Sequence, residues 1–140
     1  PGTREPSVHL AQFAETPAAW ADEALETRWS RLLEIRAAVN MALEAARQRK
    51  EIGSALAAHV TVSAGGTDWE LLNRYRLDLP MLFITSSASL ERREGAVEVR
   101  VTRATGDKCP RCWRYVDRLV AIDAETALCE RCSDAVEVSA

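Results

Sequence analysis

Four cysteines near the end of the chain carry its clearest chemical signal. They form two C-x2-C pairs, Cys109 with Cys112 and Cys129 with Cys132, and the sequence has no other cysteine. Each pair turns two thiolates toward one point, and two pairs together make the tetrahedral sulfur cage that Zn2+ prefers. We therefore expect one zinc ion. Four thiolates leave no open coordination position, so we expect a structural metal that takes no part in catalysis.

Three other uses of these cysteines stay open on the sequence alone. Disulfides need an oxidising compartment. The sequence shows no charged-then-apolar leader and no apolar run of about 18 residues, so we expect a cytoplasmic protein with no membrane partner. A redox-active C-x-x-C would explain Cys109 and Cys112 and leave the second pair unexplained. Iron could occupy the same cage, because the preference for zinc rests on ligand type.

The residues around the first pair indicate what this part of the molecule could touch. Lys108, Arg111 and Arg114 are basic, and Trp113 follows Cys112 directly. A knuckle exposes the side chains next to its ligands, so Trp113 could stack on an unpaired base while the cations contact phosphates. Trp113 could instead fill the small core of the module. The basic residues could also serve the cage, because four thiolates on Zn2+ carry a net charge of about −2.

The charge of the whole chain gives no general attraction to nucleic acid. The formal net charge of the 140 residues is −3. Two stretches differ, because residues 28–50 and residues 100–118 each contain six basic residues against two acidic ones. Two basic stretches fit two contact strips on a polyanion, and they equally fit two solvated faces.

The first third of the chain is expected to be mostly helical. Residues 1–19 contain three prolines and are expected to be irregular. Thr16 followed by Pro17 suits the start of a helix, and Ile52 followed by Gly53 suits its end. Between them, over residues 18–50, apolar side chains recur at steps of three and four; they include Leu25, Trp29, Leu32, Val39, Leu43 and Ala46.

Residues 55–106 have a different pattern, which predicts a small α+β unit. Short apolar or alternating runs predict strands over residues 57–63, 81–85 and 96–103. Residues 68–75 are expected to form a short helix. The expected order is therefore strand, helix, strand, strand.

Residues 107–140 form the predicted metal module, which we expect to follow a hinge at Gly106-Asp107. A module of roughly 35 residues cannot build a sufficient core, so the metal should supply much of its folding energy. Residues 134–140 are expected to be a short tail. The expected fold class is α+β, made of a helical segment, an α/β junction unit and a C-terminal four-cysteine zinc ribbon or knuckle module. Apolar residues expected to pack on the cage are Val116, Leu119, Val120, Ile122 and Leu128.

The sequence offers no catalytic machinery that we can name. It lacks the glycine-rich phosphate loops and the H-E-x-x-H metal motif, and no serine or cysteine nucleophile has a recognisable companion base. His59 lies in a strand-like run and is expected to be structural. We therefore expect no catalytic residue in this chain.

The string Lys108-Cys109-Pro110-Arg111-Cys112-Trp113, followed by Leu128-Cys129-Glu130-Arg131-Cys132, resembles the C-terminal zinc module of bacterial isoleucyl-tRNA synthetases. Similar motifs of that family occur in the same order upstream. They are Ser7-Val8-His9-Leu10, Leu43-Glu44-Ala45-Ala46-Arg47 with Ile52-Gly53, and Phe83-Ile84-Thr85-Ser86.

The resemblance implies a fragment of a longer class I enzyme that joins isoleucine to its tRNA with ATP and Mg2+. The chain begins at Pro1 with no methionine, which fits that expectation, and the catalytic and editing parts would lie upstream. Residues 1–54 would end the helical anticodon-binding domain, residues 55–106 would be the junction unit, and residues 107–140 the zinc-binding module. The fragment would hold the anticodon side of the tRNA and no DNA. By position, the four cysteines take the metal, and Trp113, Arg111, Arg114 and Lys108 contact RNA.

Two other functions stay open. DNA-repair glycosylases end in a similar four-cysteine finger, although the upstream stretches do not resemble that family. A free-standing zinc-stabilised interaction module is the other alternative. Binding to a damaged duplex would indicate the first, and no salt-sensitive affinity for any nucleic acid would indicate the second.

Overall fold

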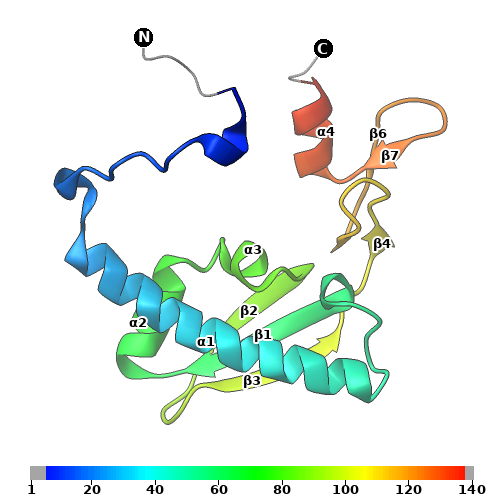
Figure 1. Ribbon diagram of the computed structural model, residues 1–140. Helices are drawn as coiled ribbons and strands as arrows, with labels where there is room; N and C mark the ends of the chain where they lie inside the picture. Colours follow the sequence, from blue (N-terminus) through cyan, green and yellow to red (C-terminus); the bar gives the residue numbers. More distant parts are fainter. Residues whose placement is uncertain (1–5, 138–140) are drawn as a thin grey trace.

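A three-stranded sheet with helices packed on one face forms the body of the molecule, and the four cysteines lie in a smaller unit beside it (Figure 1). The computed structural model describes residues 6–137. The central strand β1 (Ala58–Ala64) pairs in parallel with β2 (Ser87–Arg92) and antiparallel with β3 (Glu98–Arg103). The predicted α+β class is confirmed.

Alternation along the strands separates a buried face of the sheet from a polar one. Val60 and Val62 of β1 are completely buried in the main core. Their neighbours His59, Thr61 and Ser63 point to the other face and make hydrogen bonds with side chains of β2. A strand whose side chains alternate in this way covers a core on one side and meets polar groups on the other.

Helix α1 (Glu23–Gln48) supplies a long apolar stripe to this core. Leu32, Ile35, Val39, Leu43 and Ala46 are buried at helical spacing against the sheet. Leu25 and Trp29, which the sequence placed on the same stripe, are exposed because the first turns of α1 extend past the core. The shared core places α1 directly against residues 55–106, so the division of the chain at residue 54 stays a prediction.

The start of α1 was predicted wrongly. The helix begins after Asp22, whose carboxylate accepts a hydrogen bond from the Leu25 N–H at 2.9 Å. Such a cap stabilises a helix by about 1 kcal/mol, and Thr16 and Pro17 supply none. They precede the short 3-10 turn η2 (Ala18–Trp20). The helix also ends before Ile52 and Gly53, because Lys50 adopts a left-handed conformation with a φ of 61°.

The crossover from β1 to β2 contains helix α2 (Gly66–Arg74) and helix α3 (Leu79–Phe83). The strand predicted over residues 81–85 is therefore wrong. Leu79 and Phe83 are each 1% exposed, four residues apart on one helical face, whereas Met81 between them is 57% exposed. Pro80 is tolerated at the helix start. Ile84 ends the helix in a left-handed conformation with a φ of 57°, which costs a β-branched residue about 1–3 kcal/mol.

The metal module contains two small hairpins and a terminal helix. Strands β4 (Asp107–Lys108) and β5 (Tyr115–Val116) form the first hairpin, and β6 (Val120–Ala121) and β7 (Ala127–Leu128) form the second. Helix α4 (Glu130–Glu137) follows, so the tail predicted from residue 134 is helical as far as residue 137. Residues 138–140 lie outside the described part.

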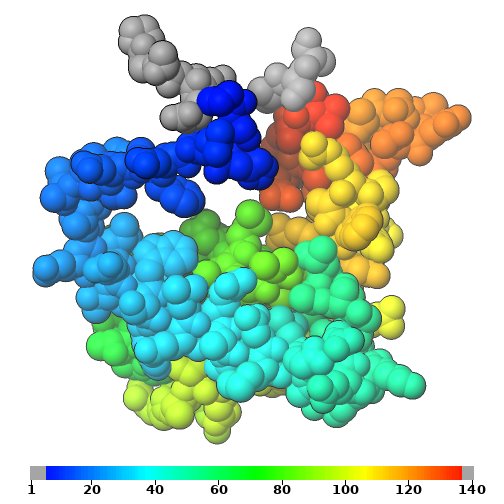
Figure 2. Space-filling view, viewed as in Figure 1, coloured from blue at the N-terminus to red at the C-terminus, as the bar shows by residue number. Residues whose placement is uncertain are grey.

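The N-terminal segment runs outside the main body before α1 begins (Figure 2, blue). It includes the 3-10 turn η1 (Val8–Leu10), and its apolar side chains Phe13 and Trp20 are fully or largely exposed. Among the described residues, no helix has both the length and the apolar character needed to cross a lipid bilayer.

Candidate metal centre and nucleic-acid interface

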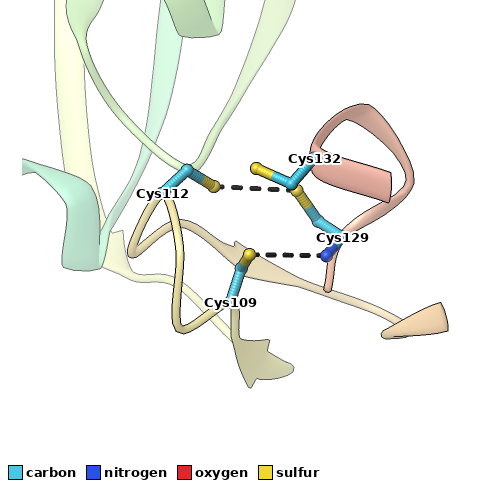
Figure 3. A group of neighbouring side chains, drawn as sticks. All are labelled: Cys109, Cys112, Cys129 and Cys132. Atoms are coloured by element: carbon cyan, nitrogen blue, oxygen red, sulfur yellow. Dashed lines mark hydrogen bonds between the residues drawn. The ribbon is translucent and has the colours of Figure 1, made fainter. Parts of the chain in front are cut away.

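The four cysteine side chains converge on one point between the first hairpin and the start of helix α4 (Figure 3). All four Sγ atoms lie within 4.8 Å of one another, and the Sγ atoms of Cys112 and Cys129 are 3.6 Å apart. Ligand sulfurs at the tetrahedral Zn–S distance of about 2.3 Å are roughly 3.8 Å apart. The donor set and its spacing therefore fit a four-thiolate zinc site.

The electrostatics of the cluster favour thiolates that share a cation. Burial raises the pKa of Cys109, but backbone hydrogen bonds outweigh it, chiefly the Cys129 N–H at 3.4 Å from the sulfur, and lower the pKa to about 6. For Cys129, burial raises the pKa to about 12. One thiol ionises readily, whereas burial and side-chain hydrogen bonds with the other three cysteines keep its neighbour protonated. A bound divalent cation would favour the thiolate form of all four cysteines.

A small hydrophobic cluster supports the cage. Cys109, Leu128, Cys129 and Cys132 are buried together. Val116, Leu119 and Ile122 pack against them, as predicted. Val120 was expected there too, and it lies half-buried in β6 outside this cluster.

The backbone of the first C-x2-C turn directs the Trp113 side chain toward solvent. The Trp113 N–H donates to the Cys109 carbonyl at 2.8 Å, and Trp113 has a left-handed φ of 66°. Trp113 is 61% exposed, and the centroid of its ring lies 5.5 Å from the Lys108 Nζ, in cation–π contact. Trp113 therefore does not fill the core of the module, which settles the alternative left open by the sequence. Arg111, between the first two ligands, is exposed.

Arg114 lies differently from the other predicted RNA contacts. Its Nη2 donates to the Ser86 carbonyl at 2.7 Å, and its Nε is buried without a hydrogen-bond partner among the described residues. The guanidinium thus ties the metal module to the sheet body. Lys108, Arg111 and Trp113 remain at the surface, and an RNA contact by any of the four stays a prediction.

Ser86 is a residue that the sequence did not indicate as important. It is buried, and its Oγ donates to the Leu56 carbonyl at 2.5 Å and accepts from the Tyr115 N–H at 2.7 Å. One serine therefore joins the segment before β1 to the first hairpin of the metal module. The only sequence signal was its place at the end of the Phe83-Ile84-Thr85-Ser86 motif.

The backbone at Gly106 is closely packed, which indicates a fixed connection to the metal module and not the predicted hinge. It has a φ of 92°, and a Cβ at this position would lie 2.2 Å from the Val116 carbonyl oxygen. Only glycine allows both the conformation and this close approach. The backbone entering the metal module is therefore packed against β5.

Half of the basic residues in the first stretch form ion pairs with acidic neighbours. Arg31 pairs with Glu34 and, in two parallel hydrogen bonds, with Asp68. Arg47 pairs with Glu44, and Arg49 with Glu51. Half of the six basic residues of this stretch therefore have carboxylate partners, which favours a solvated face over a polyanion contact.

His59 has the structural role expected of it. Its Nδ1 lies 2.7 Å from the Ser87 Oγ, and its Nε2 lies 3.1 Å from the Ser89 Oγ. Both ring nitrogens are thus engaged on the polar face of the sheet, and the ring links β1 to β2.

Comparison with known proteins agrees with this geometry. Residues 106–135 match the family described as a zinc finger found in FPG and IleRS. The chain is 43% identical to an isoleucine–tRNA ligase of Syntrophotalea carbinolica over 94% of its own length and 15% of that protein. It is 37% identical to the ligase of Geobacter sulfurreducens over 98% of the chain and 16% of the relative. It is 38% identical to that of Symbiobacterium thermophilum over 97% and 16%.

The two kinds of match differ in extent. The zinc-finger description names two kinds of protein and covers only residues 106–135. The ligase relatives also match the residues upstream of the metal module, because they extend over most of the chain. The chain spans about 15% of the length of these relatives.

Proposed function

Because the chain belongs to the isoleucine–tRNA ligases and matches a C-terminal part of them, we propose that it is the tRNA-binding end of such an enzyme. The parent joins isoleucine to its tRNA with ATP and Mg2+ in the cytoplasm, and its catalytic residues lie upstream of this chain. The fragment engages the anticodon side of the tRNA and not DNA. The chemistry within the chain is structural.

In this proposal Cys109, Cys112, Cys129 and Cys132 hold one zinc ion, which supplies a rigid, closed cage. The ion fixes the knuckle from which Trp113 projects. An exposed tryptophan flanked by cations is the observation that carries the proposal, since most tryptophans are largely buried. Trp113 stacks on an unpaired base, and Lys108 and Arg111 approach phosphates. Arg114, the fourth predicted RNA contact, lies against the Ser86 carbonyl.

The test separates the two half-reactions of the intact synthetase. Trp113→Ala should slow tRNA aminoacylation roughly fivefold or more, the effect of one lost base stack, and leave isoleucine-dependent pyrophosphate exchange near its normal rate. Trp113→Phe keeps an aromatic face and serves as the matched control. An equal loss of both activities in Trp113→Ala would contradict the proposal. Stronger binding to a DNA duplex than to tRNA would also contradict it.

A further inference from the structure

A groove of about 300 Å3 lies where helix α3 meets the metal module. Four apolar residues, Leu56, Pro80, Met81 and Ile84, line it from the side of the sheet body, and Arg114 and Arg131 line it from the metal module. We propose that this groove binds one unpaired nucleotide of the tRNA. The inference rests on the proposed function and adds a second contact site to it.

The apolar wall of the groove is held open to solvent. Met81 is 57% exposed and Ile84 is 54% exposed, although the two chain neighbours of Ile84, Phe83 and Thr85, are completely buried. Ile84 is presented by a left-handed backbone that disfavours β-branched side chains. Figure 2 shows α3 (green) reaching the surface beside the metal module (yellow to red). An exposed methionine is a polarizable and adaptable surface for a planar ring.

The opposite wall carries positive charge. Nη1 of Arg131 lies 3.7 Å and Nη1 of Arg114 lies 4.0 Å from the Met81 sulfur. Within residues 6–137, no ion pair engages either arginine. Arg114 is committed to Ser86 and lies beside the cage, so we assign the phosphate to Arg131, which is exposed. An apolar wall facing a guanidinium that has no ion-pair partner among the described residues complements a base with its phosphate.

The groove adjoins the backbone of the predicted Trp113 contact. Cys112 and Arg114, the two chain neighbours of Trp113, both line it. One single strand of RNA can therefore place one base on the Trp113 ring and an adjacent nucleotide in the groove. Unpaired loop nucleotides, and not duplex, present bases in this way.

A polypeptide segment of the parent enzyme could occupy the groove in place of RNA. Crosslinking distinguishes these two occupants. We would replace Met81 in the intact synthetase with the photo-crosslinking residue p-benzoylphenylalanine and irradiate it with its tRNA. Met41, which is 70% exposed on α1, would carry the same residue as the control position. A crosslink to tRNA at position 81 and none at position 41 is expected. A crosslink from position 81 to protein alone would overturn the proposal.

A charge substitution tests the phosphate contact. Arg131→Gln should weaken tRNA binding and reduce the slope of log affinity against log salt by about 0.7, the value for one single-strand phosphate contact. Arg74→Gln removes an exposed arginine that lies outside the groove and outside both basic stretches and should leave the slope unchanged. Zinc content of each variant verifies that the module is intact. An unchanged slope for Arg131→Gln would overturn the proposal.

The proposed function and this inference fail in different ways. Suppose that Trp113→Ala impairs aminoacylation, that Arg131→Gln leaves the salt slope unchanged, and that position 81 does not crosslink to tRNA. Only the groove assignment is then wrong. If none of the three shows an RNA contact, the proposed tRNA-binding function is wrong as well.

Discussion

The Arg114 guanidinium and the Ser86 carbonyl are joined by a 2.7 Å hydrogen bond that crosses from the metal module to the sheet body. The next residue of the module, Tyr115, donates its backbone N–H to the Ser86 hydroxyl. The two units therefore share a defined orientation, although their hydrophobic clusters are separate. Because the groove between the units takes one wall from each, this joint also fixes the distance between its two walls.

Removing the Ser86 hydroxyl should loosen this joint. Ser86→Ala leaves the Tyr115 N–H without its acceptor, and an unsatisfied buried donor costs about 1–3 kcal/mol. We expect a lower free energy of unfolding in urea and faster proteolysis of residues 104–108. Ser54→Ala is the control, because Ser54 is exposed and makes no capping hydrogen bond. Equal stability of the two variants would show that the joint does not depend on this hydroxyl.

Gly106→Ala should destabilise the entry to the metal module. The added Cβ would lie 2.2 Å from the Val116 carbonyl oxygen, and the φ of 92° is strained for alanine. We expect a loss of about 1–3 kcal/mol in the free energy of unfolding. Gly53→Ala provides the comparison, since nothing lies within 4 Å of its added Cβ, and should change stability by at most about 0.5 kcal/mol. Similar values for both variants would refute the close approach at Gly106.

Zinc removal should unfold the metal module and spare the sheet body. The module has only a small cluster around its cysteines, so bound metal supplies much of its folding free energy. After chelation, amide NMR signals of residues 107–137 should collapse to unfolded positions while those of β1 and β3 persist. All four thiols should then react with a disulfide reagent. Cys109→Ser should give the same spectrum without a chelator. A module whose signals survive metal loss would contradict a structural zinc site.

Acid should weaken the contact between α1 and α2 through Asp68. Hydrogen bonds from Arg31 lower the pKa of the Asp68 carboxyl in the folded state. A lowered pKa stabilises the fold fully above the unfolded pKa of about 3.9, and this stabilisation is lost as the pH falls through the folded-state pKa. The pair is partly exposed, so its contribution is at most about 1 kcal/mol.

The measurement is the free energy of unfolding between pH 6 and pH 2 for the natural chain and Asp68→Asn. The difference between the two should be largest near pH 6 and shrink toward zero in acid. Asp123→Asn is a comparison at an exposed loop carboxyl whose pKa is lowered by backbone hydrogen bonds and not by an arginine. A difference for Asp68→Asn that is independent of pH would rule out the ionised pair as its source.

Local patterns in the sequence were sufficient for several elements. The alternation near residues 96–103 predicted β3, and the apolar run near residues 57–63 predicted β1, each within one or two residues. The resemblance to isoleucyl-tRNA synthetases is confirmed by relatives that match most of the chain. Strand β2 was missed, because its serines and small apolar residues give a weak alternation that only pairing with β1 makes visible.

Helix α3 shows why short apolar runs mislead. Residues 81–85 are as apolar as a buried strand, and a run of that length does not separate the two structures. Burial of Leu79 and Phe83 on one helical face depends on where the core lies, and the core is made by α1 and β1 from distant parts of the chain.

The sequence by itself indicated the four candidate metal ligands and the family, because a C-x2-C pair and its flanking residues are recognised within a few positions of the chain. The sequence also indicated an exposed knuckle, but it did not show which of the flanking side chains face solvent and which bind the sheet body. Tertiary structure alone decided that Trp113 faces solvent, that Arg114 binds Ser86, and that Met81 and Arg131, 50 positions apart, meet at one groove. Such contacts depend on how the metal module packs against the sheet body. A local sequence pattern does not predict this packing, because it reflects only the neighbours of a residue along the chain.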